Sequence, residues 1–140
     1  MQDQRGCSRP RVGNAGMLVL VVDDEVAIVE LLAELLTDEG YDVHTAFDGR
    51  NALTLLRSGL RPMVIITDIM MPGLDGWGLY SAIRDELELR EPGIVLMSAG
   101  RPDPRSAGRA NPKHLPDARV TFVAKPFNVF DMLEAIARVS

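Results

Sequence analysis

Hydrophobic positions change their spacing several times after residue 16. Short runs that are apolar or alternate with polar residues are typical of strands, and longer stretches with apolar residues three and four apart are typical of amphipathic helices. The predicted strands are 17–22, 41–45, 63–67, 94–97 and 120–123. The predicted helices are 26–39, 48–58, one that opens at Asp75 and reaches Leu87, and one that starts at Asn128. Asp48 and Asn128 are of the residue types that cap helix N-termini.

Strands that alternate with helices indicate βαβ units, which need right-handed crossovers and a parallel sheet covered on both faces. The segments 17–22 and 63–67 are almost wholly apolar, as expected for strands buried on both sides. Five such strands fit a doubly wound α/β fold, a flavodoxin-like sheet of order 2-1-3-4-5 with helices on both faces. Ligands of such sheets bind at the carboxyl ends of the strands, so we expect the functional residues there.

Three carboxylates stand at strand ends that this topology makes neighbours. Asp23 and Asp24 follow the first strand, and Asp68 ends the third. Each alone is most simply a solvent-facing acid, but three in one crevice raise each other's pKa unless a positive charge neutralises them. Mg²⁺ suits this set, because it prefers one or two carboxylates together with water and phosphate oxygens. The sequence therefore predicts a magnesium site.

A hydroxyl and an ammonium group are predicted to join the same crevice. Ser98 ends the fourth strand and Lys125 ends the fifth. Either residue alone could be an ordinary surface side chain. Together with a divalent cation they are the groups that neutralise a transferred phosphoryl group, and a carboxylate can act as its nucleophile.

Four short motifs occur in order, each at a predicted strand end: VVDDE, TDIMMPGLDG, MSA and KPF. With them the chain resembles the receiver domain of two-component response regulators from about residue 17 to residue 139. The resemblance implies a phosphoacceptor, Asp68, which receives its phosphoryl group from a sensor histidine kinase or a histidine phosphotransfer protein. It implies a Mg²⁺ site made by Asp23, Asp24, Asp68 and the main-chain carbonyl of Met70. It also implies that Ser98 and Lys125 bind the phosphoryl oxygens.

The resemblance also assigns roles next to the crevice. Phe122 matches the family's switch aromatic, and Pro126 is expected to follow a cis peptide bond. Trp77 is interpreted as a packing residue. His44 and His114 have no metal-ligand partners at suitable spacing, so a structural role is expected for both, and the chain should receive phosphoryl groups but not donate them from histidine.

Composition narrows the class of protein. The chain has 140 residues, 46% of them hydrophobic, and a formal net charge of −5, which suits one globular domain and argues against nucleic-acid binding. No apolar run is long enough to cross a bilayer, and we predict no membrane contact. The single cysteine, Cys7, excludes internal disulfides and favours a reducing, cytoplasmic location.

Two parts of the chain are expected: a flexible tail at 1–16 and a receiver domain at 17–140. Because nothing follows the last helix, we expect a stand-alone domain that has no DNA-binding domain and signals through an unknown output protein. Whether it also forms a homodimer is left open, as is the alternative that it was excised from a hybrid kinase.

The segment 99–117 departs from the family pattern. It contains prolines 102, 104, 112 and 116 and lacks an apolar stripe. Interior prolines break helices, so the family's fourth helix should be short or disordered here. Three alternatives stay open: a segment ordered by phosphorylation or by a partner, a basic docking loop, or a long solvated loop.

Two other functions are alternatives to the phosphoacceptor. One is a receiver-like scaffold that is never phosphorylated. The other is a Mg²⁺-dependent aspartyl phosphohydrolase, which the chain argues against because it lacks a cap-sized insertion and has Met70 two residues after Asp68. We expect no enzyme activity beyond self-phosphorylation and autodephosphorylation.

Overall fold

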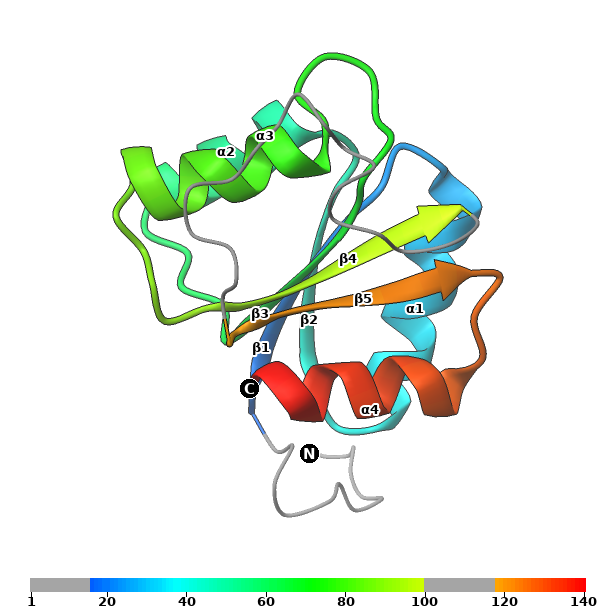
Figure 1. The fold of residues 1–140 in the computed structure, drawn as a ribbon. Helices are drawn as coiled ribbons and strands as arrows, with labels where there is room; N and C mark the ends of the chain where they lie inside the picture. The colour runs from blue at the N-terminus through cyan, green and yellow to red at the C-terminus, as the bar shows by residue number, and fades with distance from the viewer. Residues whose placement is uncertain (1–15, 100–117) are drawn as a thin grey trace.

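The computed structural model describes residues 16–99 and 118–140. Five parallel strands form one sheet in the order β2-β1-β3-β4-β5 (Figure 1), which confirms the predicted topology. The strands are β1 (Leu18–Val22), β2 (Asp42–Ala46), β3 (Val64–Asp68), β4 (Gly93–Ala99) and β5 (Val120–Lys125). β4 and β5 run two residues past the apolar runs at 94–97 and 120–123. Lys125 is the last residue of β5, as predicted, and Ser98 is the last but one of β4.

The helices are α1 (Val26–Asp38), α2 (Gly49–Arg57), α3 (Gly76–Ser81), η2 (Ala82–Glu86) and α4 (Val129–Val139). The predicted helix that opens at Asp75 is therefore α3 continued by the π-helical turn η2. The predictions for 100–117, where the family's fourth helix would lie, and for the tail at 1–15 fall outside the described residues. Within the two described ranges, no helix combines the length and the apolar content that a membrane span requires.

The sheet separates two hydrophobic layers. α1 and α4 cover one face, and α2 and α3 cover the other (Figure 1). Successive side chains of a strand point to opposite faces, so in β1 Val19 and Val21 join the first layer, while Leu20 and Val22 join the second. Because both faces are covered, all four of these side chains are fully buried, as the apolar run predicted.

The inward faces of two helices differ in part from the apolar stripes that the sequence predicts. The predicted stripes are Ile28, Leu31, Leu32, Leu35 and Leu36 in α1, and Val129, Leu133 and Ile136 in α4. In α1, Leu32 and Leu36 are buried as expected, but Leu31 is 46% exposed and Val29 takes its place. In α4, Ile136 is buried, whereas Val129 and Leu133 are only half-buried. The core-facing positions of α4 are Met132, Ala135, Ile136 and Val139. Both helices are apolar on more than one side, so spacing alone does not fix their rotation.

Within residues 16–99 and 118–140, three helices begin at a capping side chain. At each one the side-chain oxygen accepts a hydrogen bond from the backbone N–H three residues on: Asp48 (2.7 Å), Asp75 (2.8 Å) and Asn128 (2.8 Å). Such bonds satisfy one of the donors left free at a helix start. α1 differs, because its N-cap residue, Glu25, makes no side-chain capping bond.

Candidate functional site

The carboxyl ends of β1 and β3 bring three acidic side chains together. Asp23 and Asp24 follow β1, and Asp68 is the last residue of β3. Carboxylate oxygens of the three lie within 4.8 Å of one another, as the strand order predicted. Asp23 is fully buried and Asp68 is 7% exposed, whereas Asp24 is exposed at the rim. Two of the carboxylates are thus held largely out of water.

Backbone contacts fix this geometry. The N–H of Asp23 donates to the Ala46 carbonyl of β2 at 3.2 Å, and Asp23 Oδ1 accepts from the N–H of Glu25 at 2.9 Å. The loop after β3 folds back so closely that a Cβ on Gly76 would lie 2.5 Å from the carbonyl oxygen of Asp68. Only glycine fits there, which explains the DG pair of the second motif.

Lys125 places its ammonium group among these acids. Its Nζ lies 2.9 Å from Asp23 Oδ2, 3.4 Å from Asp68 Oδ2 and 3.3 Å from Glu25 Oε1. The peptide bond between Lys125 and Pro126 is cis, which confirms that prediction. The contact with Glu25 was not predicted, although the residue directly follows the two aspartates and could have been suspected from its position.

The pKa values of Asp68 and Lys125 are both raised, for different reasons. Burial, and then the charge of Asp23, raise the pKa of Asp68, and Lys125 only partly opposes this. Burial alone would lower the pKa of Lys125, but its hydrogen bond to Asp23 and the charge of Asp68 outweigh burial and raise it. Lys125 therefore stays an ammonium, and one positive charge faces several carboxylates. A second cation would be held favourably.

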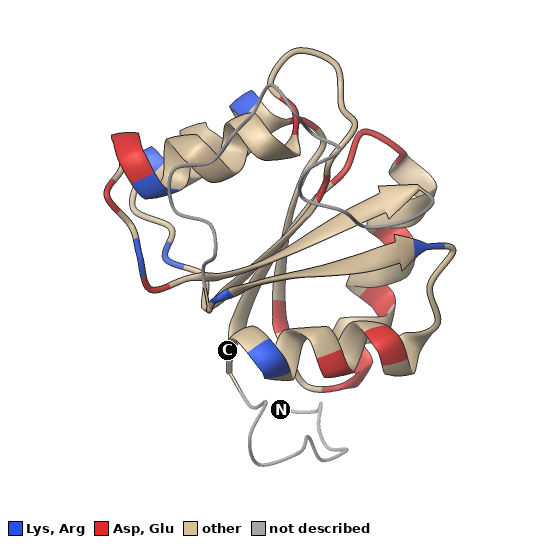
Figure 2. Cartoon of the chain, viewed as in Figure 1, with Lys and Arg blue, Asp and Glu red and all other residues tan. Residues whose placement is uncertain are grey.

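The donor set fits a hard divalent ion. All three side chains that could hold a metal offer carboxylate oxygens, which Mg²⁺ prefers to nitrogen or sulfur. Among the described residues, this is the one group of His, Cys, Asp and Glu side chains arranged for a metal. Acidic residues continue from this end of the sheet along α1, while α2 carries Arg50 and Arg57 (Figure 2).

Met70 contacts the Asp68 carboxyl group, and Ser98 lies on β4, the strand next to Asp68. Ser98 is 9% exposed and follows Met97, the register partner of Asp68 in β4, and its own register partner is Ala124 of β5. The backbone N–H of Met70 hydrogen-bonds to the Asp68 carboxyl group, which lowers the pKa of that group slightly against the larger effects. The side chain of Met70 is 67% exposed.

Three aromatic residues, Trp77, Tyr80 and Phe122, form a cluster in the hydrophobic layer that α2 and α3 cover. Trp77 is 2% exposed, and its ring centroid lies 5.8 Å from that of Phe122 and 6.2 Å from that of Tyr80. This confirms the interpretation of Trp77 as a packing residue. His44 is an exposed residue of β2 and belongs to no metal-holding group, whereas His114 lies outside the described residues.

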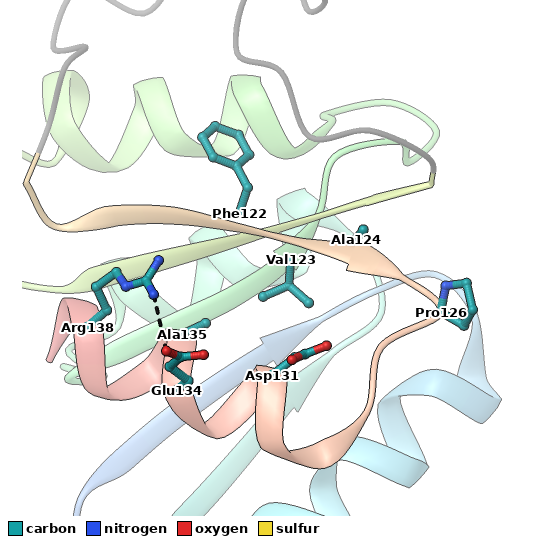
Figure 3. A pocket seen from close by; sticks show the side chains of 8 residues that line it. All are labelled: Phe122, Val123, Ala124, Pro126, Asp131, Glu134, Ala135 and Arg138. Atoms are coloured by element: carbon teal, nitrogen blue, oxygen red, sulfur yellow. Dashed lines mark hydrogen bonds and ion pairs between the residues drawn. The ribbon is translucent and has the colours of Figure 1, made fainter.

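A separate hollow of about 270 Å³ lies between β5 and α4 (Figure 3). Its charged groups are Asp131, Glu134 and Arg138, and the last two form an ion pair at 3.4 Å. Phe122 points away from α4, toward the other face of the sheet (Figure 3). None of the three clustered carboxylates lines this hollow, so it is distinct from the acidic site.

Comparisons with known proteins agree with this geometry. The family described as the response regulator receiver domain matches residues 19–137. The transcriptional regulatory protein TcrA of Mycobacterium tuberculosis is 33% identical over 99% of this chain and 53% of its own length. The response regulator PleD of Caulobacter vibrioides is 44% identical over 61% of this chain and 19% of its own length. The chain thus spans about half or less of these relatives.

Solved structures match nearly the whole chain. The chemotaxis protein CheY4 of Vibrio cholerae is 30% identical, with a TM-score of 0.76 over 90% of this chain and 100% of that one. The structure titled FixJ-N is 26% identical, with a TM-score of 0.71 over 88% of this chain and 92% of that one. Both likenesses thus cover most of this chain.

Proposed function

The chain belongs to the receiver domains of response regulators, and from this premise we propose that Asp68 accepts a phosphoryl group in a Mg²⁺-dependent phosphorelay. Receiver domains are signalling switches and not enzymes in the ordinary sense. The observation that carries the proposal is a nearly buried carboxylate, Asp68, beside two further acids and the Lys125 ammonium. The proposed donor is a phosphohistidine of a sensor kinase or a phosphotransfer protein.

The transfer follows from the groups present. A carboxylate oxygen of Asp68 attacks the phosphorus, and an acyl phosphate forms as the P–N bond breaks. The imidazole leaves with the electron pair of that bond and takes up a proton. Negative charge spreads over the phosphoryl oxygens during such transfers, so catalysis depends on positioning and charge. Lys125 neutralises one of these oxygens, and the hydroxyl of Ser98 donates to another.

The residues that would hold Mg²⁺ are Asp23, Asp24, Asp68 and the main-chain carbonyl of Met70. The ion would supply positive charge to the carboxylates and to the phosphoryl oxygens when it is bound. Two features support this assignment: the three carboxylates converge, and the backbone of Met70 lies against the Asp68 carboxyl group. Burial, and then the charge of Asp23, raise the pKa of Asp68 in spite of Lys125, so a bound cation would favour the ionised carboxylate.

The same proposal includes self-phosphorylation from small phosphodonors, autodephosphorylation, and output through protein contacts in which Phe122 changes position. Its packing against Trp77 gives that movement a defined starting point. We further propose a cytoplasmic location, which the single cysteine supports because reducing compartments disfavour disulfides.

The test is intact-mass spectrometry after incubation with acetyl phosphate and Mg²⁺. We expect one phosphoryl group on the wild-type protein, none when EDTA replaces Mg²⁺, and none on the Asp68→Asn variant. A gain in mass that persists in Asp68→Asn would show that another residue is the phosphoacceptor. No gain from acetyl phosphate or from a kinase, together with no Mg²⁺ binding in titration, would favour the scaffold alternative.

A further inference from the structure

Glu25 occupies an N-cap position without acting as a cap. Among the described residues, three helices do have a capping side chain. The caps are Asp48, Asp75 and Asn128, whose short side chains reach the backbone N–H three residues on. Glutamate is not among the residues that favour this position. In α1 the Glu25 side chain makes no capping bond, and its Oε1 lies 3.3 Å from Nζ of Lys125.

Lys125 hydrogen-bonds to Asp23 and Glu25 and forms an ion pair with Asp68. An ammonium group carries three N–H donors, and three carboxylates surround it: Asp23 at 2.9 Å, Glu25 at 3.3 Å and Asp68 at 3.4 Å. The pair with Asp23 is the one that the fold cannot release cheaply, because the Asp23 side chain is fully buried and would become an unpaired buried charge. The Glu25 side chain is 64% exposed, so water replaces Lys125 there at little cost.

We propose that Glu25 is a positioning residue that holds Lys125 in the unphosphorylated site and opposes its transfer to a phosphoryl group on Asp68. The inference rests on the proposed function. When a phosphoryl group occupies Asp68, the Lys125 donor that faced the carboxylate turns to a phosphoryl oxygen. Glu25 competes for the same ammonium and repels the added negative charge. Both effects disfavour the phosphorylated state, so Glu25 sets how readily the switch is occupied.

The probe is beryllofluoride, a non-hydrolysable mimic of a phosphoryl group on a carboxylate, and its Kd is measured by ¹⁹F NMR. Mg²⁺ is kept saturating for each variant, since removing a nearby negative charge can weaken Mg²⁺ binding. Exposed ion pairs are weak, so we expect Glu25→Gln to lower the Kd about two- to fivefold at low ionic strength. The ratio of the wild-type Kd to the Glu25→Gln Kd should fall toward one at high salt, because salt screens exposed charges.

The control is Glu34→Gln, which removes the same charge from an exposed position of α1. It lies nine residues further along, roughly 13 Å along the helix axis, and should leave the Kd unchanged. Glu25→Ser is a second variant, because serine can cap α1 and cannot reach Lys125. It should raise the melting temperature and tighten beryllofluoride binding. A merely structural role of Glu25 at the helix start would not produce the salt dependence.

The outcomes separate the two proposals. If the wild-type protein binds beryllofluoride but Glu25→Gln binds it equally or more weakly, the role of Glu25 is overturned and the phosphoacceptor proposal stands. If Glu34→Gln tightens binding as much as Glu25→Gln, the effect is one of overall charge and the role of Glu25 is again overturned. If no variant binds beryllofluoride and Asp68 is never phosphorylated, both proposals fail.

Discussion

Replacing Asp68 by Asn should stabilise the folded protein when Mg²⁺ is absent. The change keeps the size of the side chain and its ability to accept the N–H of Met70, but it removes one negative charge from a group of three clustered carboxylates. The pKa of Asp68 is raised, first by burial and then by Asp23. A raised carboxyl pKa means that the ionised form is less favourable in the folded protein than in the unfolded chain.

The size of the effect follows from the distances. At an effective dielectric constant of about 20, two like charges less than 4.8 Å apart repel by at least ~3.5 kcal/mol, and Asp68 has two such neighbours. The attraction between Asp68 and the Lys125 ammonium at 3.4 Å offsets ~5 kcal/mol of this repulsion by the same rule. About 2 kcal/mol of net repulsion remains, and solvent around the exposed Asp24 reduces it. We therefore expect Asp68→Asn to gain about 1–2 kcal/mol.

The pH dependence has a definite sign. Because the folded pKa of Asp68 is raised, its cost is fully present above that pKa and disappears as the pH falls below the ordinary value of 3.8. The asparagine variant never carries the cost. The stability difference between variant and wild type should thus be largest near neutral pH and shrink on acidification.

The assay is urea unfolding in EDTA at several pH values. Asp42→Asn is the matched control, since it makes the same chemical change at an exposed position of β2 and should stay within about 0.5 kcal/mol of the wild type. Adding Mg²⁺ should raise the stability of the wild type by ~1.4 kcal/mol at ten times its Kd, and that of Asp68→Asn by less. Equal or lower stability of Asp68→Asn in EDTA, or a difference that ignores pH, would refute the electrostatic account.

Three further substitutions test the structure around the site. Lys125→Met leaves the fully buried Asp23 side chain without its partner and should cost about 3–5 kcal/mol in EDTA by urea unfolding, partly recovered in Mg²⁺; no loss would contradict the pairing. Gly76→Ala puts a Cβ 2.5 Å from the Asp68 carbonyl oxygen, so it should cost about 1–3 kcal/mol of stability and weaken Mg²⁺ binding in calorimetry. The control is Gly59→Ala, which has open space around it and, unlike Gly76, a positive φ. It should leave Mg²⁺ binding unchanged. Asn128→Ala removes the cap of α4 and should lower stability by ~1 kcal/mol without changing phosphorylation by acetyl phosphate.

The strand order and the acidic cluster could be predicted from the sequence because both follow from periodicity. Apolar runs between amphipathic segments require a covered parallel sheet, and that sheet places the ends of β1 and β3 side by side. The cap residues Asp48 and Asn128 were predictable for a similar reason, since each acts on backbone only three residues away. Local and topological rules need no knowledge of side-chain packing.

Features that depend on packing could not be predicted. In α1, Val29 is buried and Leu31 is 46% exposed, although both are apolar, because packing against the sheet decides which side of the helix faces inward. Arg84 is 1% exposed, a burial that its residue type does not suggest. The structure shows its reason: Nη1 donates to the Leu89 carbonyl at 3.0 Å, and the guanidinium lies 5.6 Å from the centre of the Tyr80 ring.

The same strands supply both the hydrophobic core and the acidic site. Within β1 and β3 the side chains are buried on both faces and contribute stability, whereas the residues at their carboxyl ends are acids that repel one another. Such a site costs stability, and natural proteins tolerate this cost where a function depends on it. A neutral or fully paired Asp68 would give a more stable fold, but it would also remove the unbalanced charge that favours a cation and a reactive carboxylate. The instability expected at Asp68 is therefore part of how this chain would bind Mg²⁺ and accept a phosphoryl group.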